Sequence, residues 1–210
     1  MRNPQYFLLL LFFLIMQNHL THQQIQKLGN TLIYLVNNVG ELSKTKILKL
    51  LFLLEESSVK RFGYPFFGLN FQIWKLGPVL KEVYIDLSED APNLLKDFIE
   101  KDPYDNKLYK AKGQFSDDQF SDNDIYLLEK IKDFSRHKTA KDLIDYTHEE
   151  NSLWRKSAIK NGILQELELS EINSTEFVID FSLLFENDET LKERYLESLE
   201  NLEFINHLKG

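Results

Sequence analysis

The stretch that decides the fold is Ser43–Val79, SKTKILKLLFLLEESSVKRFGYPFFGLNFQIWKLGPV. In its first half, residues 47–54 are apolar except for Lys49. The leading serine suits a helix N-cap and Gly63 suits a left-handed helix end, so the sequence predicts a helix over 44–62. A helix that is apolar on nearly every side packs on more than one face. We therefore expect this helix to lie at the centre of the protein.

The second half of the stretch predicts a strand and a turn. Apolar side chains alternate with small or polar ones over residues 67–74, and a period of two indicates a strand with one buried face. Gly77 and Pro78 predict a turn, and proline suits the first turn of a helix. We therefore expect a second helix over 79–87.

Elsewhere, apolar residues recur at three- and four-residue spacing, which predicts further helices. We expect these helices at 22–39, 94–100, 122–136, 140–149, 153–160 and from Asp188 onward. A short strand is expected at 108–112 and a hairpin over 164–181. The sequence therefore predicts a mainly α fold, a compact single helical domain with a few short strands.

The chain has no repeats, low-complexity tracts or flexible linkers, which favours one domain over 17–161 with a C-terminal extension, 162–210, packed on it. Residues 1–16 form an apolar leader. Its run Tyr6–Met16 is too short to cross a bilayer as a helix. Two interpretations stay open: a mis-assigned start, with translation beginning at Met16, or a secretory signal or membrane anchor.

Composition limits the function classes. Net charge is -8, from 33 acidic and 25 basic residues, which disfavours general binding to nucleic-acid phosphates. There are no cysteines, so disulfides, thiolate catalysis and cysteine-based zinc sites are excluded. This composition fits a reducing cytoplasm, which is the location we expect. Membrane association is disfavoured unless the leader is real.

No catalytic constellation is present in the sequence. It lacks the His-Glu-x-x-His motif, a phosphate-binding loop and a Gly-x-Ser-x-Gly elbow. Residues 147–150 (THEE) are the single cluster that joins an imidazole to carboxylates. They suit a helix end where His148 meets the C-terminal dipole under Trp154. Acid–base catalysis by His148 is the alternative. We expect no enzyme, no metal, no cofactor and no small-molecule substrate.

The helix over 44–62 also carries a polar stripe. At about 100° per residue, Lys46, Lys49, Glu56 and Lys60 fall within one narrow sector. The simpler interpretation is a solvated edge supported by the Glu56 to Lys60 charge pair. The functional alternative is a cationic strip that faces an acidic partner.

Three segments, in order, resemble the Panacea domain of the SocA-like antitoxin family of bacteria and phages. The first is KILKLLF at 46–52, similar to the family's lysine–leucine helix. The second is IWKLGPV at 73–79, which resembles the family's aromatic-x-x-Gly-Pro-Val signature and is followed by Val83-Tyr84. The third is THEENSLW at 147–154, similar to the family's Thr-His-x-Glu and following Pro-Trp. Together they cover about 20–160.

Three positions depart from the family pattern. Phe52 replaces a tyrosine, Ile73 an alanine and Leu153 a proline. The substituted side chains are similarly bulky, so these changes leave the expected fold intact. They put only the detail of the binding surface in doubt. The resemblance implies an antitoxin that neutralises a cognate protein toxin, encoded nearby, by direct contact. The alternative is a DNA-binding or adaptor-type regulator of the same operon, using the basic segments 44–49 and 156–160.

The partner-binding candidates come from the stripe, the Gly-Pro turn and the THEE segment. Aromatic and charged anchors of this kind dominate interface energetics. For the two tryptophans, burial in the core is the competing expectation. The candidates are Lys46, Lys49, Trp74, Gly77, Pro78, Tyr84, Thr147, His148, Glu149 and Trp154.

Overall fold

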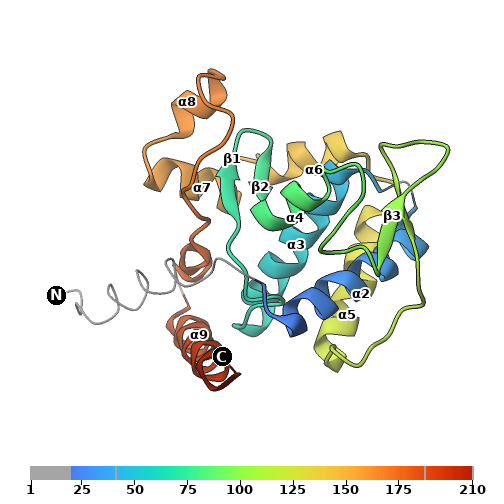
Figure 1. Ribbon diagram of the computed structural model, residues 1–210. Coiled ribbons are helices and arrows are strands. Elements are labelled where there is room, and N and C mark those ends of the chain that lie inside the picture. The colour runs from blue at the N-terminus through green and yellow to red at the C-terminus, as the bar shows by residue number, and fades with distance from the viewer. Residues whose placement is uncertain (1–19, 41, 187, 210) are drawn as a thin grey trace.

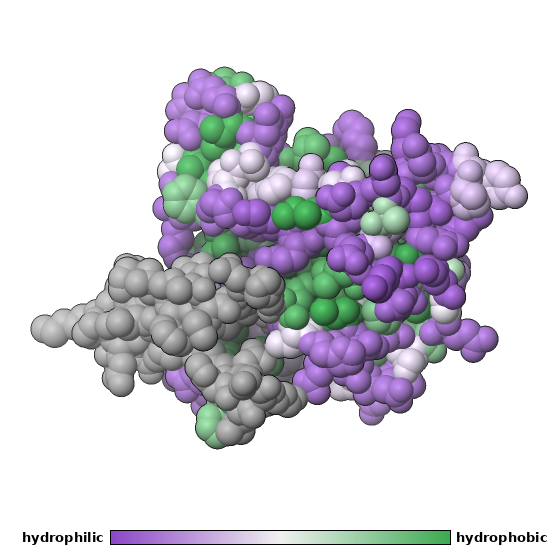
Figure 2. Space-filling view, in the orientation of Figure 1, coloured by the Kyte–Doolittle hydropathy of each residue, from purple (hydrophilic) through white to green (hydrophobic). Residues whose placement is uncertain are grey.

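The computed structural model describes residues 20–40, 42–186 and 188–209. The leader expected over 1–16 lies outside these residues. Among the described residues, no helix has the length and apolar character needed to cross a membrane. Polar side chains cover most of the face in Figure 2, with apolar residues gathered near its centre.

Helices make up most of the described chain, so the predicted mainly α fold is confirmed (Figure 1). The helices are α2 (His22–Val39), α3 (Lys44–Phe62), α4 (Lys81–Asp86), α5 (Asp122–Ser135), α6 (Ala140–Thr147), α7 (Leu153–Lys160), α8 (Leu164–Glu168), α9 (Glu189–Lys209) and the 3-10 helix η1 (Phe181–Phe185). Two short antiparallel strand pairs accompany them. They are β1 (Gln72–Trp74) with β2 (Gly77–Val79), and β3 (Ile99–Lys101) with β4 (Tyr109–Ala111).

Helix α3 has the predicted bounds and the predicted central place. The Ser43 hydroxyl accepts a hydrogen bond from the Lys46 N–H, and Gly63 ends the helix with a φ of 70°. Ile47, Leu50 and Leu54 are fully buried. Figure 1 shows α3 in the middle of the molecule, with α2 and α5 on one side and the β1–β2 hairpin on the other. α3 also contacts α6, η1 and α9.

The strand expected over 67–74 is wrong in its first part, because only residues 72–74 pair as β1. The N–H groups of Phe67 and Gly68 donate instead to the buried carboxylate of Glu55, at 2.7 and 3.2 Å. A side chain of α3 therefore takes the place of a neighbouring strand. Pro78 lies in β2 rather than in a helix, so α4 begins at Lys81, two residues later than predicted.

The hairpin expected over 164–181 is also wrong. Residues 164–168 form α8, and residues 173–179 run along β1. The Ile73 N–H donates to the Phe177 oxygen at 2.8 Å, and the Lys75 N–H to the Asn173 oxygen at 3.0 Å. The tail pairs with the free edge of β1 instead of folding back on itself, and this satisfies backbone groups on both segments.

The short helix expected over 94–100 is replaced by a turn and by β3. The buried Asp86 carboxylate accepts hydrogen bonds from the N–H groups of Asn93, Leu94 and Leu95. These bonds hold the chain in a turn, and β3 then pairs with β4. The strand expected at 108–112 is confirmed as β4.

Candidate partner-binding site

The three segments that carry the family resemblance meet at Lys49. This side chain is 1% exposed, and its Nζ donates a hydrogen bond to the Pro78 carbonyl at 2.9 Å. Burial lowers the pKa of Lys49 to about 7. Lys46 is also buried. The expected solvated edge is therefore wrong at these two positions, since the hairpin packs over this face of α3.

Gly77 allows the hairpin to approach both α3 and α6. Its φ is +97°, in the left-handed region that favours glycine. A Cβ at this position would lie 2.8 Å from the Thr147 Oγ1 and 2.9 Å from the Lys49 Cε. The Gly-Pro turn, the lysine of α3 and the end of α6 thus form one close-packed contact.

His148 ends α6 and packs on Trp154, as the sequence predicted, with ring centroids 4.0 Å apart. The His148 Nδ1 lies 2.7 Å from the Ile144 oxygen, and its Nε2 lies 2.9 Å from the Lys75 oxygen. Both ring nitrogens of His148 therefore lie within hydrogen-bond distance of a backbone carbonyl oxygen, which holds the ring between α6 and the hairpin. Trp154 Nε1 donates to the Trp74 oxygen at 2.9 Å.

Six of the ten candidate residues are buried: Lys46, Lys49, Gly77, Pro78, Thr147 and Trp154. We call five of these the buried hub, namely Lys49, Gly77, Pro78, Thr147 and Trp154. These residues are enclosed, so their direct contribution is to hold α3, the hairpin, α6 and α7 together.

The other four candidates reach the surface. Trp74, Tyr84 and His148 are half-buried and Glu149 is exposed. The rings of Trp74 and Tyr84 pack edge to face with centroids 4.7 Å apart. The structure therefore brings these two aromatic residues together beside the hairpin, where part of each stays accessible.

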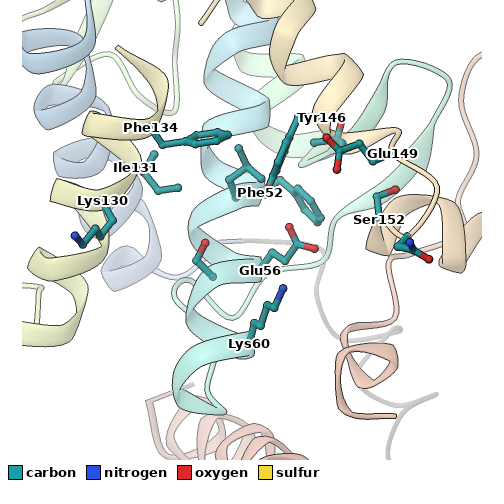
Figure 3. A pocket seen from close by; sticks show the side chains of 13 residues that line it. Phe52, Glu56, Lys60, Lys130, Ile131, Phe134, Tyr146, Glu149 and Ser152 are labelled. Carbon is teal, nitrogen blue, oxygen red and sulfur yellow. The ribbon is translucent and has the colours of Figure 1, made fainter. Parts of the chain in front are cut away.

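A groove that the sequence did not reveal runs beside the C-terminal half of α3. Its main cavity, about 470 Å³, has Phe52, Phe134 and Tyr146 among its lining residues (Figure 3). A second cavity of about 310 Å³ lies toward η1 and shares Glu56 and Lys60 with the first. The two cavities adjoin at these shared residues, and we call them together the α3 groove. Only its α3 side could be recognised in the sequence, as the polar stripe. The rest of the groove is formed by side chains from other elements, among them α5 and α6.

Carboxylates set the electrostatics of the α3 groove. Glu56 is half-buried, and no cation of the described residues lies within 4.0 Å of its carboxylate. Burial raises the pKa of Glu56 to about 7, and Lys60 opposes this rise. Burial also raises the pKa of Tyr146, helped by the negative charges of Glu56 and Glu149. Figure 3 shows the Glu56 and Lys60 side chains pointing toward the same space as Tyr146.

The described residues contain no cluster of three or more histidine or carboxylate side chains that could hold a metal ion. The described residues that line the α3 groove include carboxylates, aromatic rings and lysines but no histidine. Such a set suits contact with another molecule's side chains.

Comparison with known proteins identifies a family. No curated protein and no solved structure matches the chain. The sequence model described as "Antitoxin SocA-like, Panacea domain" matches residues 47–155, just over half of the chain. This match runs from α3 into α7 and includes the whole buried hub. The chain therefore belongs to the SocA-like antitoxin family, and α3 through the start of α7 form its Panacea domain.

Proposed function

We propose that this protein is an antitoxin that neutralises a cognate protein toxin, encoded nearby, by direct protein–protein binding in the cytoplasm. The observation that carries the proposal is the family match over 47–155, which falls on one packed unit. Neutralisation of this kind requires a complementary surface and no reaction chemistry. The composition of the α3 groove and the absence of a catalytic motif in the sequence agree with that requirement.

The buried hub and the exposed candidates have different proposed roles. The hub positions the hairpin, because Lys49 of α3 donates to the Pro78 carbonyl and Trp154 of α7 donates to the Trp74 carbonyl. Partner contacts then come from the accessible side chains beside it, among them Trp74, Tyr84, His148 and Glu149. Half-buried aromatic residues next to charges are the side chains that anchor protein interfaces.

The basic segments offer little to a DNA-binding alternative. The Lys44 Nζ donates to the Ser88 Oγ at 2.9 Å and lies 4.3 Å from the centroid of the Tyr84 ring. Lys156 pairs with Glu186 at 3.1 Å, and Lys160 pairs with Asp180. These lysines are already engaged with groups of the same chain, which weakens their attraction for phosphates.

Expression of the neighbouring reading frame tests the proposal. We expect that frame alone to arrest growth, and co-expression of this protein to restore growth and to yield a complex that co-purifies. Normal growth with the neighbouring product expressed and soluble would overturn the proposal. A gel shift on the operon's own promoter, with affinity falling steeply as salt rises, would favour the regulator instead.

A further inference from the structure

The α3 groove has a chemistry more specific than a general protein contact. We infer that it binds a basic side chain, arginine above all, presented by a segment of the partner protein. This inference rests on the proposed function in one respect, namely that the partner is a protein. The groove itself supplies the choice of side chain, through its carboxylates and its aromatic wall.

Two carboxylates in the groove form no ion pair with another described residue. Glu56 projects from α3 and Glu149 follows the end of α6, and neither forms an ion pair within 4.0 Å. Both lie close enough to Tyr146 for their charges to act on its hydroxyl. The charges of both carboxylates would therefore attract a cation that enters the groove beside Tyr146.

Aromatic rings form the wall beside these carboxylates. Phe134 of α5 and Tyr146 of α6 pack edge to face with centroids 5.1 Å apart, and Tyr146 is 41% exposed. Phe52 is also part of the lining and is 1% exposed. A guanidinium group stacks on such rings while its N–H groups meet carboxylates, and a lysine ammonium does so less well. Arginine is therefore the side chain that fits best.

The lysines of the groove do not reverse this preference. Lys156 is paired with Glu186 at 3.1 Å, and the Lys130 Nζ lies 5.5 Å from the centroid of the Tyr126 ring. Lys60 is exposed and lies one turn beyond Glu56 on α3. Its charge lowers the pKa of Glu56, but it forms no ion pair with that carboxylate.

Peptide selection tests the inference without knowledge of the toxin. The full chain is immobilised, and a phage-displayed library of random dodecapeptides is selected on it. We expect enrichment of peptides with arginine flanked by apolar residues. Replacing the arginine of a selected peptide by citrulline, its neutral isostere, should weaken binding about tenfold.

Matched variants locate the site. Glu56→Gln preserves the shape of the groove and removes one charge, so it should weaken binding of the selected peptide about tenfold. Tyr146→Ala should also weaken binding. Glu100→Gln removes the same charge from the exposed face of β3, outside the groove, and should leave binding unchanged. Thermal unfolding of each variant verifies that the fold is intact.

Several outcomes would overturn the inference. These are a selection without basic residues, a selection that yields no binding peptide, or arginine peptides that bind Glu56→Gln as well as wild type. Enrichment of acidic peptides that depend on Lys60 would assign the groove to anions instead. The growth assay reads out the antitoxin function separately. If co-expression restores growth but the peptide selection yields no arginine peptides, the groove inference alone is overturned. If arginine peptides are selected but the neighbouring gene product does not arrest growth, only the antitoxin proposal is overturned.

Discussion

Two ionisable residues of α3, Lys49 and Glu55, are buried and serve as anchors for the chain that follows. Lys49 binds the carbonyl of Pro78, and Glu55 accepts the N–H groups of Phe67 and Gly68. Burial moves both pKa values to about 7, downward for the lysine and upward for the glutamate. The two groups hold different segments, so each can be tested by itself.

The first prediction concerns the Lys49 amine. Its folded pKa lies below the unfolded value, so the cost of burying the charge is present in full below about pH 7 and disappears as pH rises toward the unfolded pKa. The free energy of unfolding of wild type, relative to Lys49→Met, should rise by about 1.4 kcal/mol per pH unit between pH 7.5 and 9.5. Urea unfolding at several pH values measures this difference. Parallel curves for the two proteins would contradict it.

The second prediction concerns Glu55. In Glu55→Ala the buried N–H groups of Phe67 and Gly68 lose their acceptor, and each such loss costs about 1–3 kcal/mol. We expect the free energy of unfolding to fall by about 2–5 kcal/mol, with a smaller loss in Glu55→Gln. Glu100→Ala, at an exposed position, is the control and should change stability by less than about 0.5 kcal/mol. Equal effects at the two sites would refute the anchoring role.

At the scale of elements, the β1–β2 hairpin joins α3 to α6. Ile73 pairs with Pro78 in its register, Lys49 reaches it from α3, and His148 reaches it from the end of α6. A hairpin this short is marginal by itself. Its stability therefore comes from the helices on either side, and the close approach at Gly77 is the condition for that packing.

The third prediction tests this close approach. Gly77→Ala combines a positive φ with a Cβ that overlaps Thr147 and Lys49, so it should destabilise the protein by about 3 kcal/mol. Gly162 has a φ of +70° and no atom within 4 Å of its added Cβ. Gly162→Ala should cost only about 1 kcal/mol. Chemical denaturation of both variants gives the comparison, and equal losses would show that packing at Gly77 is unimportant.

At the scale of the whole molecule, the C-terminal tail completes the core outside the matched family region. Residues 173–179 run along β1, and the Phe181 ring lies 6.1 Å from Phe52 and 6.4 Å from Phe71, centroid to centroid. Tyr195 of α9 is also buried. We propose that 162–210 belongs to the same folding unit as 17–161.

The fourth prediction follows from these contacts. A chain that stops after Gly162 leaves the β1 edge unpaired and exposes the Phe52 and Phe71 rings, so we expect it to lose about 5 kcal/mol or more and to aggregate. The full-length chain, measured beside it, is the control. Thermal unfolding and size-exclusion chromatography distinguish the two. A stable, monomeric 1–162 chain would show that the tail is a separate accessory.

The sequence alone determined most of the long helices and the family. Repeating apolar positions and capping residues such as Ser43 and Thr139 act within one or two turns, so the bounds of α3 and the start of α6 could be predicted locally. The resemblance could be found because its motifs are short and stand in a fixed order. The same local information could not show that Lys49 is buried. A polar stripe on a helix has the same sequence pattern whether water or a hairpin covers it.

Tertiary structure decided which polar groups are satisfied inside the protein and which stay accessible at its surface. Glu55 replaces a strand neighbour for residues 67–68, and the tail replaces a hairpin of its own by pairing with β1. The α3 groove exists because α3, α5 and α6 place Glu56, Phe134 and Tyr146 around one space. Backbone groups and carboxylates form hydrogen bonds with groups that are near in space, even when these are far apart in the sequence. Local sequence patterns do not show which distant segments come together.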